Sequence, residues 1–319
     1  MQPVLTPRLT VVVPVYGNEG SIDELLAALS GIGASMDGSF EAVLVVDGSP
    51  DRSFALLHER LPGAGFDSTL IALSRNFGAF AAIRAGLEQA RGDVIAVMAA
   101  DLQEPPELAL QFHARLAAGD GDVAFGVRES RQDPALSQLA SGLFWRVYRR
   151  WVMPDIPKGG VDIFALTSGF RDRLVALREA NSSLLAQLFW LGGRRVFVPY
   201  QRRAREHGKS AWTLRKKMRY LSDSVFAFTD LPVRLLIWAG MAGLVIAGLA
   251  GVVTALARFA GMVDVPGYAM TMLAILFFGA LNSLGLGVVG SYAWRAFENT
   301  KQRPLAVVQS FQQFGSARP

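Results

Sequence analysis

The run Leu9–Val15, with the sequence LTVVVPV, decides the fold, and Ala42–Val46, with the sequence AVLVV, repeats its character. Both runs are short, rich in valine and free of polar alternation, which is typical of strands covered on both faces. Similar runs occur at Thr69–Leu73, Val94–Met98 and Asp122–Phe125, and helix-like stretches separate them at Ser21–Leu29, Ser53–Arg60, Ala79–Ala90 and Pro106–Ala117. This alternation predicts an α/β domain with a mostly parallel sheet and crossover helices.

The composition limits what kind of protein this is. Of the 319 residues, 51% are hydrophobic and 18% are charged, whereas an average soluble domain has roughly 25% charged residues. Part of the chain is therefore expected not to face water. The lack of cysteine excludes disulfides, thiol catalysis and cysteine–zinc sites. His58, His113 and His207 are scattered, and the first ten residues hold no hydrophobic signal core, so we expect a cytosolic N-terminus.

The last third of the chain contains two long apolar runs. Leu235–Ala257 is interrupted only by Thr254, and Tyr268–Ala293 carries no charge. Each run reaches the roughly 20 residues that a helix needs to cross a bilayer, so we expect two transmembrane helices. A buried hairpin in a soluble protein is the alternative, but two long uncharged runs are costly to cover in water.

Charges around these runs predict the topology. Basic residues precede the first run (Arg215, Lys216, Lys217, Arg219, Arg234) and follow the second (Arg295, Lys301, Arg303), while the loop between them is nearly uncharged. The positive-inside rule therefore places both ends in the cytosol. The amphipathic stretches Leu136–Met153 and Trp212–Phe228 suit the headgroup layer. Packing on the domain core explains the first equally well, whereas the second runs directly into the predicted membrane.

Polar clusters follow the predicted strands at the edge where parallel sheets bind ligands. They are Pro14–Glu19, Asp47–Asp51, Ser74–Gly78 and Asp101–Pro106. Asp101 is placed to hold a divalent metal against a diphosphate, and Asp47 to contact a base or ribose. Because turns also favour aspartate for structural reasons, a strand-to-helix cap is the alternative for the Asp47 cluster.

Two segments suit phosphate. Ser74–Gly78 opens a helix, and its backbone amides together with Arg75 could meet a phosphate, although helix capping explains the segment equally well. Tyr200–Trp212 reads YQRRAREHGKSAW and gathers arginines around Gly208 just before the membrane. A phosphate carried on a membrane lipid would lie at the level of this segment, at the membrane surface. A basic patch without a specific ligand, in a chain of net charge +5, is the alternative.

Together these motifs resemble glycosyltransferase family 2, in the polyprenyl-phosphate branch that includes dolichyl-phosphate mannose synthases and bacterial undecaprenyl-phosphate sugar transferases. The matching segments are Val13–Tyr16 with Asn18–Glu19, Asp47–Asp51, Leu73–Gly78, Ala85–Leu87, Gly92–Asp93, Asp101–Glu107, Gly159–Asp162, Arg205–Ser210 and Lys301–Pro304. The similarity runs from about residue 8 to residue 308. No single motif is specific, but the combination is.

The resemblance implies a GT-A fold and an inverting transfer of a hexose from a UDP- or GDP-linked sugar to an undecaprenyl-type phosphate. Donor binding is expected at Pro14, Tyr16, Glu19, Asp47 and Ser49, with Arg75, Asn76 and Gly78 beside them. Asp101 and Gln103 are the expected ligands of Mg or Mn. Arg205 and Ser210, joined by Arg202, are expected to hold the acceptor phosphate, and Asp162 matches the aspartate that faces the reaction centre.

The sequence departs from the family at two positions. Val46 and Ala99 stand where the family usually has aspartate, and each change removes a carboxylate from the donor site. These changes favour a non-catalytic membrane protein that kept the fold, but Asp101, Gln103, Asp162 and the Arg205–Ser210 element argue against it. A processive polysaccharide synthase would need a Gln-x-x-Arg-Trp motif and more spans, and the sequence contains neither.

We therefore expect a cytosolic domain at 1–210, an amphipathic helix at 211–230, two transmembrane helices within 231–298 and a cytosolic tail at 299–319. The expected location is a bacterial-type cytoplasmic membrane, where the lipid-linked sugar would serve cell-envelope glycan or lipopolysaccharide modification. Small residues in the spans permit a homo-oligomer. No nucleic-acid partner is expected.

Overall fold

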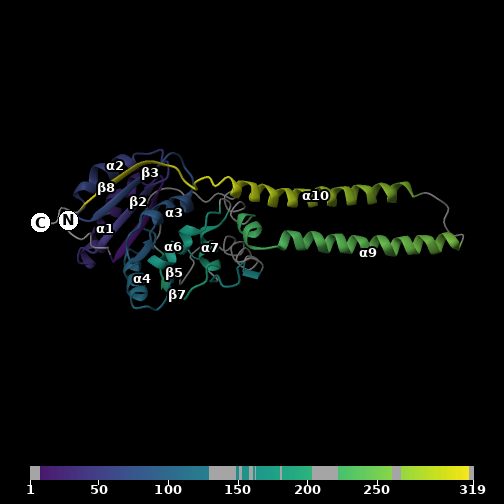
Figure 1. Ribbon diagram of the computed structural model, residues 1–319, viewed down its shortest axis with the longest axis horizontal. Helices are drawn as coiled ribbons and strands as arrows, with labels where there is room; N and C mark the ends of the chain where they lie inside the picture. Colours follow the sequence, from purple (N-terminus) through teal and green to yellow (C-terminus); the bar gives the residue numbers. More distant parts are fainter. Residues whose placement is uncertain are drawn as a thin grey trace.

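The computed structural model describes residues 8–128, 149–150, 153–157, 161, 163–179, 182–202, 222–260 and 267–315. They form an α/β domain from which two long helices extend on the same side (Figure 1). The amino-terminal part of the chain builds most of the domain, and the helices come near the carboxyl terminus.

One sheet of eight strands forms the centre of the domain, in the order β7-β5-β6-β4-β1-β2-β3-β8. The strands are β1 (Leu9–Val15), β2 (Phe40–Val46), β3 (Asp67–Leu73), β4 (Val94–Val97), β5 (Val123–Arg128), β6 (Phe164–Thr167), β7 (Arg195–Tyr200) and β8 (Val308–Phe314). Strands β6 and β8 run antiparallel to their neighbours, and the other pairs are parallel. The prediction of a mostly parallel sheet is confirmed.

Helices cover both faces of this sheet. They are α1 (Ile22–Ser35), α2 (Ser53–Arg60), α3 (Ala79–Gln89), α4 (Glu107–Ala117), α6 (Ser168–Ala176) and α7 (Leu184–Trp190), with short 3-10 turns at Glu19–Ser21 and Leu61–Gly63. Val11 and Val13 pack in a core with α1 and α4, whereas Val12 packs in a second core with α3 and α6. Because both faces are buried, β1 is apolar at every position except Thr10, whose buried hydroxyl donates to Glu41.

The last strand, β8, was not predicted. Residues 299–319 were expected to form a tail, but Val308–Phe314 pairs antiparallel with β3, from Leu73 opposite Val308 to Ser68 opposite Phe314. The chain therefore leaves the domain, forms the two long helices and returns to the edge of the same sheet (Figure 1).

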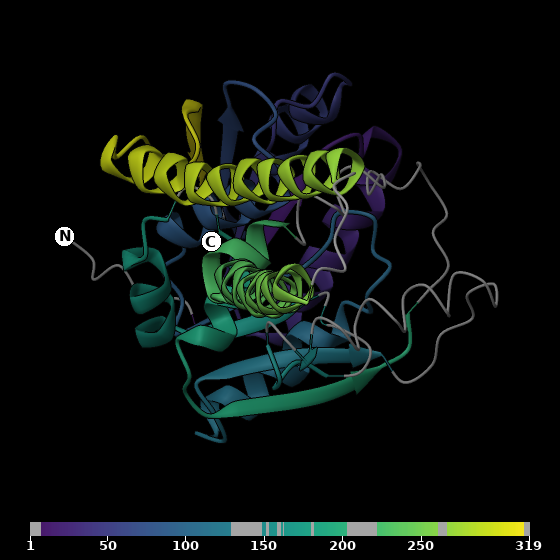
Figure 2. The same cartoon turned by 90° about the vertical axis from the view of Figure 1, so that its right-hand side faces the viewer.

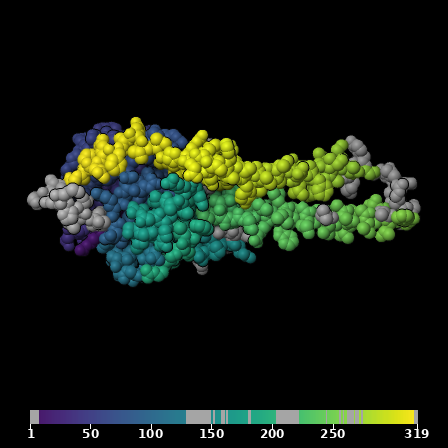
Figure 3. All heavy atoms as spheres, viewed as in Figure 1, coloured from purple at the N-terminus to yellow at the C-terminus, as the bar shows by residue number. Residues whose placement is uncertain are grey.

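The two long helices are α9 (Leu231–Phe259) and α10 (Tyr268–Thr300), which contain both predicted spans. Each is long and apolar enough to cross a membrane. Their side chains are widely exposed, as the 71% exposure of Trp238 and the 67% exposure of Ile246 illustrate. Figure 3 shows the pair projecting from the domain, and in Figure 2 α9 is seen almost end-on while α10 crosses the view. Such apolar surfaces indicate association with a membrane.

The helical residues 222–228 connect the helix pair with the domain. Val225 and Phe228 pack against the second core, and Asp223 accepts a 2.8 Å hydrogen bond from Arg295 of α10. The end of the predicted amphipathic stretch thus contacts both the α/β domain and α10. Its residues 212–221 and most of Leu136–Met153 lie outside the described residues.

Candidate active site

The loops after β1 and β2 are joined by hydrogen bonds at the carboxyl edge of the sheet. The Gly17 amide donates to the Ser49 hydroxyl at 2.8 Å, and that hydroxyl donates to Asp51 at 2.6 Å. The Glu19 amide donates to Asp51 at 3.0 Å, while the Glu19 carboxylate accepts from the Arg52 amide at 2.9 Å. Glu19 and Ser49, both predicted donor-binding residues, therefore also fix the shape of these loops.

Asp51 is the centre of this network. Burial alone would raise the pKa of its carboxyl group, but hydrogen bonds from the Ser49 and Ser53 side chains and from the Glu19 and Ser53 amides outweigh burial and lower the pKa below its ordinary value. The carboxylate is therefore ionised at neutral pH. The sequence carried a signal for this role, because aspartate in a turn often accepts a hydrogen bond from the backbone amide two residues later, as Asp51 does from Ser53.

Asp47 joins the β2 loop to the start of α3. Its side chain is 2% exposed and accepts hydrogen bonds from the backbone amides of Phe77 at 2.7 Å and Gly78 at 2.8 Å. Gly48 has a φ of +56°, and a Cβ there would collide with the backbone of Arg75. Asp47 therefore fixes the Ser74–Gly78 loop from the neighbouring strand, while the described structure shows no side-chain cap on α3 itself. Two of the amides that could meet a phosphate bind Asp47 instead.

Tyr16 and Arg75 are predicted donor residues with exposed side chains. Tyr16 is 44% exposed, and Arg75 stacks its guanidinium 4.0 Å from the centre of the Phe77 ring. Asn76 is exposed as well, whereas Pro14 is half-buried within β1. Tyr16 and Arg75 extend from the loops after β1 and β3, on either side of the β2 loop, at the same edge of the sheet.

The loop after β4 carries the predicted metal ligands. Asp101 is half-buried, and its carboxylate accepts a long hydrogen bond of 3.4 Å from the Gln103 amide. Leu102 adopts a φ of +51°, which is uncommon for a residue other than glycine and reverses the chain between the two ligands. The Ser21 hydroxyl donates to the Ala100 carbonyl at 3.0 Å, which ties this loop to the start of α1.

Arg202 brings the acceptor side of the site to this loop. It follows β7, and its guanidinium donates to the side-chain oxygen of Gln103. Its Nε lies 3.8 Å from a carboxylate oxygen of Glu104, which is 3% exposed. The structure thus brings together Arg202 and Gln103, which are 99 residues apart in the chain. Glu104 was quoted in the sequence motif but had no predicted role.

The residues of this loop fit a divalent metal. No cluster of three or more histidine, cysteine, aspartate or glutamate side chains occurs in the described part of the chain. The Asp101 carboxylate and the Gln103 amide offer oxygen, which Mg and Mn prefer. Magnesium commonly binds through one or two carboxylates together with substrate phosphates, so this short ligand set suits an ion that arrives with a diphosphate. Ala99 is half-buried, and Val46 is buried in the core.

Three predicted site residues are not placed. Asp162, Arg205 and Ser210 lie outside the described residues. The carboxyl edge as described therefore comprises the donor loops, the Asp101 loop and Arg202.

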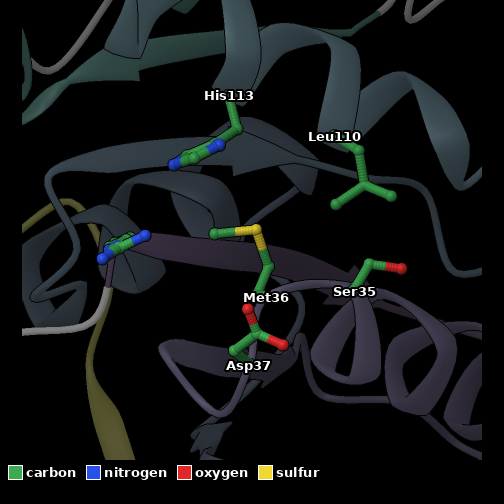
Figure 4. Close-up of a pocket in the computed structure, with 6 residues that line it drawn as sticks. Ser35, Met36, Asp37, Leu110 and His113 are labelled. Atoms are coloured by element: carbon green, nitrogen blue, oxygen red, sulfur yellow. The ribbon is translucent and has the colours of Figure 1, made fainter.

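A hollow of about 300 Å³ lies at the opposite edge of the sheet and holds none of these residues. Figure 4 shows His113 and Leu110 projecting from α4 toward Met36 and the end of α1, and Arg8 also lines the hollow. Burial, then the nearby Arg8, lower the pKa of His113, and Asp93 opposes them.

Comparisons with known proteins agree with this geometry. The family model described as "Glycosyl transferase family 2" matches residues 10–167. An uncharacterized glycosyltransferase of Synechocystis, sll0501, is 30% identical over 305 residues, which is 95% of each chain. The undecaprenyl-phosphate 4-deoxy-4-formamido-L-arabinose transferase of Pseudomonas paraeruginosa is 33% identical over 97% of this chain and 91% of its own.

Among solved structures, a mannosyltransferase from Pyrobaculum calidifontis in complex with GDP-Man and Mn2+ is similar over 92% of this chain and 86% of its own, at 21% identity and a TM-score of 0.47. The curated relatives match at higher identity and over nearly their full length. The chain therefore belongs to glycosyl transferase family 2 and is a glycosyltransferase with a GT-A-like mixed α/β domain.

Proposed function

We propose that the chain transfers a sugar from a nucleotide-sugar donor to a polyprenyl phosphate at the cytosolic face of a membrane. One observation carries this proposal: the ligand edge of the sheet adjoins the base of the helix pair. The Ser74 amide donates to the Val307 carbonyl at 2.9 Å, and α10 ends only seven residues earlier, at Thr300. A donor bound at this edge would lie beside the bilayer that presents the lipid.

The return of β8 supports the proposed topology. Because β8 and β3 share one sheet, the segments before α9 and after α10 lie on the same side of any membrane that the pair crosses. We propose a catalytic domain at 1–210, a juxtamembrane helix at 211–230, two spans within 231–298 and a carboxyl-terminal segment at 299–319, whose strand β8 completes the sheet of the catalytic domain. We propose that the domain lies in the cytosol, at the inner membrane of a bacterial-type cell, which the basic flanks of the two spans support.

Donor binding is assigned to two groups of residues. Tyr16, Arg75 and Asn76 would contact the nucleotide directly, since their side chains are exposed at the edge. Pro14, Glu19, Asp47, Ser49 and Gly78 would shape the pocket, since they are half-buried or bonded within and between the loops. The donor is taken to be UDP- or GDP-linked, as the family resemblance implies.

Asp101 and Gln103 would hold Mg or Mn beside the donor diphosphate. The metal would neutralise the charge that develops on the leaving diphosphate. Asp101 supplies a full negative charge to this ion and Gln103 a neutral oxygen, so Asp101 contributes more to the attraction.

The acceptor phosphate would be oriented by Arg202, Arg205 and Ser210. One phosphate oxygen attacks the anomeric carbon and forms the new C–O bond, while the bond to the nucleoside diphosphate breaks on the opposite face, which inverts the configuration. A phosphate monoester has a second pKa of about 6 and is already largely dianionic near neutral pH, so no strong base is required. Asp162 would then position the acceptor or steady positive charge on the sugar.

A donor panel tests the proposal. Purified full-length chain is incubated with undecaprenyl phosphate and UDP- or GDP-linked sugars, with and without chelator, and free nucleotide is measured. We expect one donor to release nucleotide only when the lipid is present, and chelator to abolish that release. Absence of lipid-dependent release with every donor would favour the non-catalytic alternative, while long polymeric products would favour a processive synthase.

A further inference from the structure

Arg202 occupies a position between two proposed ligand sites. It lies two residues after β7, at the start of the basic segment assigned to the acceptor phosphate. Its guanidinium nevertheless contacts the loop after β4, through the Gln103 oxygen and the Glu104 carboxylate. The Arg202 side chain is 32% exposed, so solvent and ligands reach it.

The contact with Gln103 affects the same oxygen that the metal site needs. Arginine is always charged and donates to this oxygen, which withdraws electron density from the ligand and holds the amide in one orientation. A divalent ion at Asp101 and Gln103 would also feel direct repulsion from the nearby guanidinium. Arg202 therefore opposes metal binding for as long as it stays on Gln103.

The Glu104 contact is loose enough for Arg202 to change partners. The distance of 3.8 Å from Nε to the carboxylate is longer than a hydrogen bond. A phosphate monoester offers the paired oxygen acceptors that a guanidinium binds best. An acceptor phosphate that reached Arg202 would therefore compete effectively for it.

We propose that Arg202 is a positioning residue that couples the two sites: in the free enzyme it restrains Gln103, and the acceptor phosphate draws it away and so strengthens metal binding. This inference rests on the proposed function. Because linkage is reciprocal, bound metal would strengthen phosphate binding by the same factor. The complete site would then form when donor, metal and acceptor are all present.

Metal binding without turnover provides the test. Mn²⁺ binding to the full-length chain in detergent is followed by the electron paramagnetic resonance signal of free Mn²⁺. Arg202→Gln removes the charge and is expected to tighten Mn²⁺ binding about tenfold, since a unit charge lying a few ångströms from a divalent ion is removed. Arg115→Gln is the matched control: it removes one charge at the far end of α4, where Arg115 pairs with the exposed Asp120, and should leave Mn²⁺ binding unchanged.

A second arm adds farnesyl phosphate, with farnesol as the control that lacks phosphate. Farnesyl phosphate should tighten Mn²⁺ binding to the wild-type chain severalfold, and this gain should shrink in Arg202→Gln. Equal Mn²⁺ affinity of the wild-type and Arg202→Gln chains, or an undiminished farnesyl phosphate effect in the variant, would overturn the coupling. If Arg202→Gln fails to fold, Arg202→Lys replaces it and must likewise reduce the farnesyl phosphate effect.

The result separates this inference from the proposed function. Lipid-dependent nucleotide release with no change of Mn²⁺ affinity in Arg202→Gln would refute the coupling and keep the function. Tighter Mn²⁺ binding in Arg202→Gln, without lipid-dependent release from the wild-type chain, would refute the function and keep the contact between Arg202 and the metal loop.

Discussion

The two edges of the sheet each hold a buried glutamate beside an arginine, and the two pairs differ in how tightly they are bound. At the amino edge Glu41 is 1% exposed and accepts hydrogen bonds from Arg91 at 2.8 Å and from the Thr10 hydroxyl at 3.0 Å. At the carboxyl edge the Arg202 Nε lies 3.8 Å from Glu104. The close pair stabilises the fold, whereas the looser pair leaves an arginine able to exchange partners at the site.

The largest effect is expected at the carboxyl edge, from Asp101→Asn. Removal of this charge should lower lipid-dependent nucleotide release by about 100-fold to 1000-fold, because the metal would lose its only charged protein ligand in the proposed set. The melting temperature should change little, since Asp101 is half-buried and asparagine keeps nearly the same size and an acceptor oxygen. Unchanged nucleotide release in this variant would contradict the metal assignment.

The next largest effect is expected at the amino edge, where a substitution should lower stability and leave metal binding unchanged. Glu41→Gln should cost about 2 kcal/mol of stability, because the buried side chain loses its charge-assisted hydrogen bond with Arg91, while the half-exposed Arg91 charge is still solvated. That corresponds to a fall in melting temperature of roughly 4–8 °C. The remaining folded protein should bind Mn²⁺ as the wild type does.

A surface carboxylate supplies the control for Glu41. Asp172 pairs with Arg171 but is 68% exposed, so Asp172→Asn should shift the melting temperature by about 2 °C or less. A similar loss of stability in both variants would refute the comparison between the two edges.

Removal of β8 tests whether the strand that follows α10 supports the donor loops. A chain that ends at Pro304 loses the β3–β8 pairing and the hydrogen bond from Ser74 to Val307. We expect the KM for the nucleotide sugar to rise severalfold, roughly the effect of losing a hydrogen bond of about 1 kcal/mol that holds the Ser74–Gly78 loop. A chain that ends at Gly315 keeps the strand and is the control. Equal KM values in both chains would show that β8 does not support the loop.

The smallest effect is a pH dependence at the amino-edge hollow. Because the pKa of His113 is lowered in the folded chain, the unfolded chain binds the proton more readily. Stability from this group is complete above the ordinary histidine pKa of about 6.5 and is lost as the pH falls below it. His113→Gln should reduce the fall in melting temperature between pH 7.5 and pH 5.5. An identical fall in the variant would show that His113 does not cause it.

The sequence predicted the strands that are buried on both faces. The bounds of β1 agree with the predicted run, and those of α2 agree as well, because their apolar patterns and flanking polar residues leave few alternatives. The position of the site was predictable for a related reason: the carboxyl ends of parallel strands meet at one edge, so Tyr16, Asp47 and Asp101 had to lie near one another.

The remaining parts depend on contacts that the sequence does not display. The strand β8 reads VQSFQQF, and its polar residues give no sign of a partner more than 230 residues earlier in the chain. Asp47 in a turn suits both ligand binding and capping, and only the geometry shows that it accepts the Phe77 and Gly78 amides. The contact of Arg202 with Gln103 likewise joins loops that follow separate strands.

The central claim is that this edge of the sheet carries out sugar transfer to a lipid phosphate. The most direct measurement compares the wild-type, Asp101→Asn and Asp172→Asn chains with undecaprenyl phosphate and the active donor, and identifies the lipid product by mass spectrometry. The account predicts a new lipid whose mass exceeds that of undecaprenyl phosphate by one sugar residue, formed by the wild-type and Asp172→Asn chains and nearly lost in Asp101→Asn. Absence of that lipid in all three chains, or equal amounts from all three, would contradict it.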